Sequence, residues 1–353
     1  NFFKIRNSAI LKDGSFRKVS DSRDSFVLPF KDDLVLRRRY VNIRGNVRFG
    51  KILENMDTFA VWLAYRHCQK GENMGKTPCH PPMIIVTACV DRIALHSHAI
   101  MLNRDVLVEG RVTWVGRSSM EVIMDLLQKD DNGEPALTMR AKFVMVARHP
   151  TENRSVDINP LKPQTDEEIS LYKEAEKKNE NRRLLHSRSL LKVPPNEFEC
   201  GILHDLSGGA FEHRVLPKGF TWMEDHKLKN TIVCFSQERN LYGKIFGGFL
   251  MRSSYELAWT CASLLCGEKL NTLALDSFMF RKAVEIGSFL FLESQVCYTN
   301  GNHVHVRVLA EVLDIRKRTK ETTNTFHFFF GTDGEPVKQL MPRTYAGKDF
   351  TYP

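Results

Sequence analysis

The sequence predicts an α+β protein built from two copies of one structural unit. Residues 42–50 and residues 240–248 share the frame N-x-x-G-x-x-x-x-G, and an apolar pattern of helical spacing follows each segment at once. Behind each helical pattern come segments rich in β-branched and other apolar residues, separated by turn signals. One helix followed by several antiparallel strands is typical of an α+β fold, and its repetition predicts two similar domains in one chain.

In the first copy, we expect a helix directly after Gly50, because apolar residues recur there on one helical face. The first forty residues are polar and irregular, apart from a short strand expected at residues 26–30, which Pro29 interrupts. The strands expected after the helix cover residues 84–87, 106–115, 119–127 and 137–147.

The second copy repeats this order, with a helix expected from Gly248 onward. Its strands are expected at residues 231–235, 272–280, 289–298, 303–313 and 322–330. Between the copies, Thr165 is a plausible N-cap of a charged helix, which we expect to be a solvated linker. The predicted organisation is an N-terminal arm at 1–23, a first domain at 24–150, a charged linker at 151–199 and a second domain at 200–345.

Length and composition are those of a protein with a sizeable core. The chain has 353 residues, of which 42% are hydrophobic, and this is enough for two domains of ordinary size. The longest apolar run, residues 83–90, has the length of a strand and is far shorter than the about 20 residues of a membrane helix. Because the first residue is Asn1, we expect that any targeting segment has been removed or was never part of this sequence.

The formal net charge is +9, and the basic residues are scattered. They form no stripe interleaved with aromatic residues, so nucleic acid is not the expected partner, whereas a phosphate-bearing small molecule fits the charge. Eight cysteines without a C-x-x-C motif indicate buried reduced thiols. Two His-Cys pairs frame a short loop, but their spacing fits no standard zinc arrangement; these residues are His67, Cys68, Cys79 and His80.

The two copies differ at one chemically informative position. Seven residues past the last shared glycine, the first copy has Asp57 and the second copy has Tyr255. Asp57 lies on or beside the apolar stripe of its helix, where a carboxylate is costly unless it is paired or functional. An ordinary aspartate on the flank of a helix is the alternative. The repeat favours a single composite site that one half has kept and the other has altered.

Two further features precede the second helix. Gly247 and Gly248 expose backbone N–H groups at the start of a helix, where the helix dipole suits a carbonyl oxygen that gains negative charge. A flexible turn is the alternative reading of these glycines. Asn240, like Asn42 in the first copy, lies on the loop before the helix, and a turn or capping role is its alternative.

Other motifs are weaker. Residues 71–77 resemble a phosphate-binding loop but are one residue short and follow a helix instead of a strand. No G-x-S-x-G is present, which disfavours a serine hydrolase of the α/β type. Residues 157–162 read D-I-N-P-L-K and are reminiscent of a hotdog hydratase signature, but Lys162 stands where that signature has its base histidine.

Several of these segments together resemble the hotdog-fold acyl-CoA thioesterases. The matching segments are residues 240–251 around the second helix start, residues 53–68 around Asp57, and residues 116–122 at a strand. The resemblance covers about residues 24–340 and both halves. It implies two tandem hotdog domains, each a long central helix wrapped by an antiparallel sheet, which pair so that the sheets run on continuously and the helices face each other.

The resemblance also implies roles for individual residues. Asp57 matches the family's catalytic aspartate and Asn240 its catalytic asparagine, so the expected reaction is hydrolysis of an acyl-CoA thioester to a free fatty acid and CoA. Asp57 would activate a water that Asn240 orients, and direct attack by the carboxylate to give an anhydride is the alternative. Gly247 and Gly248 would bind the thioester oxygen. Expected contacts to the phosphates of CoA are Arg117, Ser118 and Ser119.

The pair Asn42 and Tyr255 departs from the family pattern, so we expect the second half-site to be inactive in hydrolysis. The resemblance also implies a homo-oligomer of double-hotdog subunits in the mitochondrion, and a reaction that needs neither a metal nor a redox cofactor. Two rival functions remain open. One is a hotdog acyl-CoA dehydratase or hydratase, for which neither copy supplies a histidine at the motif, and the other is a non-catalytic module that binds acyl-CoA.

Overall fold

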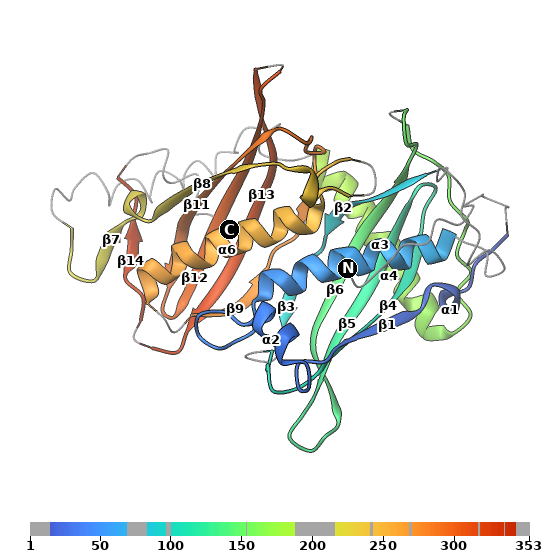
Figure 1. The fold of residues 1–353 in the computed structure, drawn as a ribbon, viewed down its shortest axis with the longest axis horizontal. Coiled ribbons are helices and arrows are strands. Elements are labelled where there is room, and N and C mark those ends of the chain that lie inside the picture. The colour runs from blue at the N-terminus through green and yellow to red at the C-terminus, as the bar shows by residue number, and fades with distance from the viewer. Residues whose placement is uncertain are drawn as a thin grey trace.

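Two long helices lie on one face of a large antiparallel sheet (Figure 1). The structure is a computed structural model, and it describes residues 15–68, 83–96, 100–152, 154–187, 216–240, 243–267, 270–316, 318–334 and 336–343. No helix among these residues is long and apolar enough to cross a membrane. The zinc candidates Cys79 and His80 and the loop at residues 71–77 lie outside the described residues.

The first unit runs from β1 to β6 around the helix α3. Its elements are α1 (Val19–Ser22), β1 (Asp24–Leu28), α2 (Leu34–Tyr40), α3 (Phe49–Cys68), β2 (Ile84–Val90), β3 (Ile93–Leu95), β4 (Val106–Val115), β5 (Ser119–Lys129) and β6 (Pro135–Arg148). The linker contains α4 (Asp166–Ser187). The inward side chains of the strands and the apolar stripe of α3 form one continuous core.

The second unit repeats this order around the helix α6. Its elements are β7 (Phe220–Trp222), a 3₁₀ turn η2 (Met223–Asp225), β8 (Lys227–Val233), a second 3₁₀ turn η3 (Ser236–Glu238), α6 (Gly247–Cys266), β9 (Leu270–Leu275), β10 (Phe278–Met279), β11 (Phe289–Asn300), β12 (His303–Asp314), β13 (Thr319–Thr332) and β14 (Gln339–Met341). The strand pairing β8-β11-β12-β13 repeats β1-β4-β5-β6, so the predicted repeat is confirmed as a repeat of topology.

The two half-sheets join at a central seam and form one twelve-stranded sheet. At the seam, β3 pairs antiparallel with β9, and β2 pairs antiparallel with β10. Ala94 lies opposite Ala274, and Cys89 lies opposite Met279. The result is two helices, each wrapped by its own antiparallel strands on a continuous sheet, which is the arrangement expected of a double hotdog.

The shared N-x-x-G segments form the same turn in both units. Asn42 N–H donates to the Asn46 carbonyl at 2.8 Å, and Asn240 N–H donates to the Lys244 carbonyl at 2.7 Å. The glycines Gly45 and Gly243 have φ of 78° and 73°, a left-handed conformation that glycine adopts without steric cost. The repeated sequence therefore encodes a turn that delivers the chain into each central helix.

The first turns of α3 and α6 pack against each other in antiparallel directions. A Cβ on Gly50 would lie 3.2 Å from the Arg252 side chain, and a Cβ on Gly248 would lie 3.0 Å from the Glu54 backbone. Each position is 198 residues from its counterpart, so the contact is isologous about a pseudo-two-fold axis. The axis also brings together Glu54 and Arg252, whose Oε1 and Nε atoms are 3.3 Å apart.

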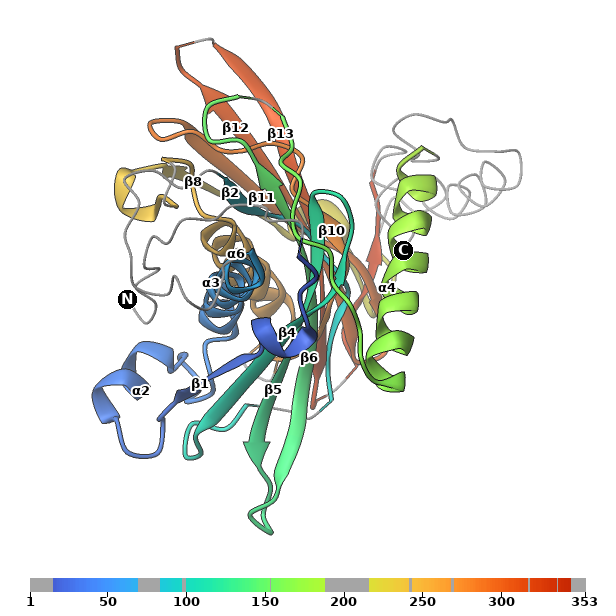
Figure 2. The same ribbon diagram turned by 90° about the vertical axis from the view of Figure 1, so that its right-hand side faces the viewer.

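Three segments differ from the sequence prediction. The first forty residues are not all irregular, because α2 forms over Leu34–Tyr40, capped by the Asp33 carboxylate, which accepts from Leu36 N–H at 2.8 Å. Residues 15–23 of the predicted arm pack on the first unit, and Arg17 is 8% exposed. The linker helix α4 is not fully solvated, since Ala175 is 1% exposed and α4 lies on the sheet face opposite α3 and α6 (Figure 2).

Replacement of the two interface glycines tests how closely the helices approach. Gly248→Ala should lower the free energy of unfolding by about 1–3 kcal/mol, because its Cβ meets the backbone of α3, which cannot move aside alone. Gly50→Ala is the matched comparison and should lower it by less, since the nearest atoms to its Cβ are in the Arg252 and Tyr255 side chains, at 3.2 and 3.3 Å, and alanine favours the helix. Urea unfolding measures both, and equal losses would contradict the predicted packing.

Candidate functional site

Asp57 is fully buried between the two units. It lies two turns into α3, with no exposed surface, and it faces the start of α6. The interpretation as an ordinary aspartate on a helix flank is therefore wrong. A buried carboxylate needs hydrogen-bond donors, and here they come from two elements far apart in the sequence.

Both carboxylate oxygens of Asp57 accept a short hydrogen bond. The backbone N–H of Gly248, in the first turn of α6, donates to Oδ2 at 2.6 Å. The Thr87 hydroxyl, on β2, donates to Oδ1 at 2.5 Å. The positive end of the α6 dipole also points at the carboxylate. One unit thus supplies the acid and the other supplies the helix terminus that holds it.

Burial dominates the ionisation of Asp57 and raises its pKa from 3.8 to about 6. The hydrogen bonds from Thr87 and Gly248 act in the opposite direction, and the charge of Glu54 raises the pKa slightly further. A carboxylate with a pKa near 6 is ionised at neutral pH and is a stronger base than an exposed aspartate. The geometry therefore suits proton abstraction.

The pseudo-two-fold equivalent of this site is filled by aromatic rings. Tyr255 takes the place of Asp57, and its hydroxyl lies 2.6 Å from the Thr272 hydroxyl. Phe49 takes the place of Gly247, and its ring centroid is 5.2 Å from that of Tyr255. Burial raises the pKa of Tyr255 above its ordinary value, so the phenol stays neutral. The second half-site therefore holds neither a carboxylate nor a glycine beside the position of Asp57.

The structure places both predicted glycines at Asp57. A Cβ on Gly247 would lie 3.1 Å from Oδ2, so a side chain there would crowd the carboxylate. The N–H of Gly248 is directed at Asp57 rather than at a bound carbonyl, which differs from the sequence expectation. Gly247 is the first residue of α6, and its N–H belongs to the helix terminus that has no intrahelical acceptor.

Asn240 lies on the loop that leads into α6, and its side-chain oxygen accepts from Lys244 N–H at 3.1 Å. Asn240 therefore has the turn role that is the alternative to a catalytic one, and its role toward Asp57 stays a prediction. Of the three residues predicted to bind phosphate, Arg117 and Ser118 lie in the turn between β4 and β5, and Ser119 is the first residue of β5. Arg117 is largely exposed, with Nε 3.7 Å from Asp157. The Ser119 carbonyl accepts from Gly116 N–H and closes the hairpin, while the Ser118 carbonyl accepts from Ala147 N–H of β6.

Thr87 is the site residue that sequence reasoning missed. Thr87 lies in an apolar strand segment, and no local sequence pattern marks it as a site residue. The signal lies in the repeat, because Thr272 occupies the first strand after the helix in the second copy and contacts Tyr255 as Thr87 contacts Asp57. Both copies therefore have a threonine hydroxyl beside the position at which Asp57 and Tyr255 differ, and this shared feature identifies Thr87 as a site residue.

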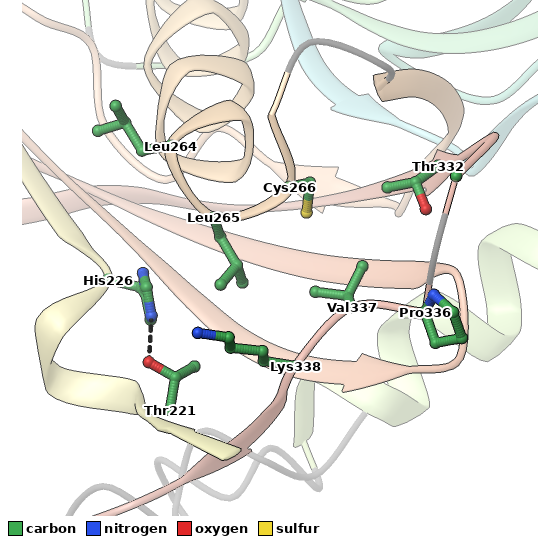
Figure 3. A pocket seen from close by; sticks show the side chains of 10 residues that line it. Thr221, His226, Leu264, Leu265, Cys266, Thr332, Pro336, Val337 and Lys338 are labelled. Carbon is green, nitrogen blue, oxygen red and sulfur yellow. Dashed lines mark hydrogen bonds between the residues drawn. The ribbon is translucent and has the colours of Figure 1, made fainter. Parts of the chain in front are cut away.

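Other candidate groups lie elsewhere. His67 Nε2 is 2.8 Å from the Asn159 carbonyl, and the part of the chain that the structure describes holds no cluster of three metal-ligating side chains. A cavity of about 460 Å³ lies at the far end of α6, where Thr221 and His226 are hydrogen bonded at 2.8 Å (Figure 3). The eighteen residues from Gly248 to Cys266 place that cavity about 27 Å along the helix from Asp57.

The raised pKa of Asp57 predicts a stability effect that depends on pH. The folded state holds the proton more tightly than the unfolded state, so this contribution to stability is present below pH 3.8 and is lost as pH rises through about 6. At pH 8, the free energy of unfolding of Asp57→Asn should therefore exceed that of the parent by up to about 3 kcal/mol. Near pH 4, the two values should be equal.

Urea unfolding across that pH range measures the effect, with the exposed Asp32→Asn as control. A loss of stability at pH 8 in Asp57→Asn alone would contradict the assigned environment of the carboxylate.

Comparison with known proteins identifies relatives along most of the chain. It is 40% identical over 337 residues to the mitochondrial acyl-coenzyme A thioesterase 9 of Mus musculus, a match that covers 94% of this chain and 75% of the relative. The human protein of the same name is 39% identical over the same shares. The mitochondrial acyl-coenzyme A thioesterase 4 of Humulus lupulus is 35% identical, over 91% of this chain and 62% of that protein. No protein-family model matches the chain.

A solved structure agrees with the fold. The putative oleoyl thioesterase of Lactobacillus plantarum aligns with a TM-score of 0.52 at 12% identity, and the alignment covers 89% of this chain and 96% of that one. At this identity the likeness concerns the fold alone. The sequence relatives, together with the tandem helix-and-sheet units and the carboxylate held between them, show that the chain belongs to the acyl-CoA thioesterase family of hotdog hydrolases.

Proposed function

We propose that this protein hydrolyses acyl-CoA thioesters to free fatty acid and CoA at Asp57. The observation that carries the proposal is the burial of one ionisable carboxylate at the N-terminus of the partner unit's central helix, held by Gly248 and Thr87. The names of the relatives give the substrate class. The raised pKa of about 6 gives the carboxylate its basicity.

In the proposed reaction, Asp57 removes a proton from water as the water oxygen bonds to the thioester carbon. The carbon–sulfur bond then breaks, and the CoA sulfur leaves with the proton that Asp57 has taken. The N–H of Gly247 is the proposed donor to the carbonyl oxygen, because Gly248 already donates to Asp57. No step requires a metal or a redox group.

The pseudo-two-fold symmetry supports a role for Asn240. In the first unit, the N-x-x-G loop lies at the partner unit's half-site, since Arg44 donates to the Leu270 carbonyl at 2.6 Å and Arg48 pairs with Glu256 at 2.6 Å. The same symmetry would bring the loop of Asn240 to β2 and Asp57. We propose that its amide orients the attacking water.

The strand register supports the phosphate contacts. Met120, Met145 and Thr87 form one row across β5, β6 and β2, so Ser119 is one residue from the row that ends at the site. Two strand spacings put that loop about 10 Å from Thr87. A CoA molecule with its thioester at Asp57 extends well beyond this distance, and Arg117 is exposed there to meet a phosphate.

Cell location and assembly follow from the relatives and stay proposals. The mouse and human relatives are named as mitochondrial proteins, and we propose the same compartment for this chain. A homo-oligomer of double-hotdog subunits is proposed on the earlier resemblance, and sedimentation analysis would test it.

Asp57 and Tyr255 should respond differently to conservative substitution. Asp57→Asn keeps the shape of the side chain but removes the base, and it should lower kcat by about 10²–10⁴. Tyr255→Phe, the matched change in the other half-site, should leave most of the rate. Release of free thiol from acyl-CoAs of graded chain length measures both. Equal losses would contradict a single site, and product formation with the thioester intact would indicate a dehydratase or hydratase instead.

The pH dependence of kcat/KM should report the ionisation of Asp57. Only the ionised carboxylate accepts a proton, so kcat/KM should fall about tenfold per pH unit below pH 6 and level off above it. Rates measured between pH 5 and pH 8 test this, and a flat profile across that range would remove Asp57 from the role of base.

A further inference from the structure

A second cleft opens on the opposite face of the sheet from Asp57. It has a volume of about 790 Å³ and lies over the seam where β2 and β3 of the first unit meet β10 and β9 of the second. The linker helix α4 crosses this face and closes one side of the cleft with Lys178 and Asn181 (Figure 2). Both units and the linker therefore contribute to its walls.

The lining of this cleft contains five cationic side chains and one carboxylate, that of Asp91. They are Arg92, Arg140, Lys142, Lys178 and Arg281. Three of these cations are already paired at the rim. Arg140 binds Asp125 through two hydrogen bonds of 2.6 and 2.8 Å, while Lys142 and Lys178 share Glu174 at 3.0 and 2.9 Å.

The other two cations, Arg92 and Arg281, form no ion pair in the part of the chain that the structure describes. Both are exposed, and they come from different units. Arg92 directly precedes Ile93, which is fixed at the seam opposite Leu275. Arg281 directly follows Phe280, whose N–H donates to the Ala88 carbonyl of β2 at 2.9 Å. Both arginines thus extend from backbone next to the seam, and their guanidinium donors are unused by carboxylates of the described residues.

Size and lining define the ligand. A cleft of this volume is far larger than a single inorganic ion needs and falls in the range of small-molecule sites. Phe278 and Met279, which directly precede the segment of Arg281, add apolar side chains to the lining of the cleft. We propose that the seam cleft binds a phosphorylated small molecule with a flat or apolar part, whose phosphates Arg92 and Arg281 hold from the two units.

This site is separate from the place of the thioester. Along β2, Thr87 faces α3 and donates to Asp57. A shift of register between Thr87 and Cys89 breaks the regular alternation of the strand, and Cys89 lines the cleft on the other face. The continuous sheet separates the two, because β2 is paired on both sides, with β6 and with β10. A ligand in the cleft does not reach the reacting atoms, so the proposal does not rest on the function assigned to Asp57.

Calorimetric titration of the full chain with adenosine 5′-diphosphate, used as a probe, tests the proposal. The unsubstituted protein should bind one molecule per chain. Arg92→Gln/Arg281→Gln should weaken binding about tenfold or more, because both charged contacts are lost. The matched control Arg38→Gln/Arg39→Gln removes the same charge from exposed positions of α2, on the helix side of the sheet, and should bind as the parent does (Figure 2).

The KM for acyl-CoA separates this site from the phosphate contacts of the substrate. It should be the same in Arg92→Gln/Arg281→Gln as in the parent. Absence of saturable binding to the parent, or an equal loss in the control variant, would overturn the proposal. A rise in KM that accompanies the loss of probe binding would also overturn it, since the cleft would then hold the nucleotide end of the substrate itself.

Discussion

The hydrogen bond from Gly248 N–H to Asp57 is the interaction on which the arrangement of the site depends. It joins a side chain of one unit to the backbone of the other, with a donor–acceptor distance of 2.6 Å. Such a contact exists only while the first turns of α3 and α6 are pressed together, and glycines at positions 50 and 248 permit that approach. The packing of the two units and the chemistry of Asp57 are therefore one structural requirement.

The pseudo-two-fold axis makes the difference between the half-sites interpretable. Gly247 beside Asp57 and Phe49 beside Tyr255 are the same pair of positions on the two sides of the axis. On one side, glycine lets the helix terminus come close to a buried carboxylate, whose burial is costly. On the other side, two rings fill the space and bury apolar surface instead, which favours folding. The aromatic half-site thus adds apolar packing, and the other half-site carries the buried carboxylate that we propose to be reactive.

The sequence predicted the regular elements well because their periodicity is local. The strand at residues 106–115 is confirmed to the residue as β4, and the helix expected after Gly50 forms as α3, which begins at Phe49. The short helix α2 was missed because its seven residues include three consecutive arginines and show no apolar stripe. The packing of α4 on the sheet was not predicted, because its sequence is mostly charged and the few residues that contact the sheet, such as Tyr172, form no recognisable apolar pattern.

The same distinction between local sequence signals and long-range contacts applies to the residues of the site. The repeat singles out Asp57 and the glycine pair as candidates because it exposes what differs between its copies. Thr87 and the direction of the Gly248 N–H depend on contacts across 30 and 191 residues that no local pattern records. Sequence spacing can indicate which groups meet. It does not determine which atom of a group is already used, and that decides whether Gly248 serves the substrate or the carboxylate.

Two opposing effects on Asp57 have to balance for it to act as a base. Complete burial alone would raise the pKa of a carboxyl group by as much as about 3–5 units and leave it protonated at neutral pH. Two strong donors and the α6 dipole without burial would lower the pKa and give a weak base. Here the net pKa is about 6, within one unit of neutrality. Loss of the Gly248 hydrogen bond would remove one of the two contacts that lower this pKa and would shift the carboxyl group toward its protonated form. The hydrogen bond between Asp57 and Gly248 therefore depends on how the two units are joined, and the continuous sheet at the seam fixes that relation.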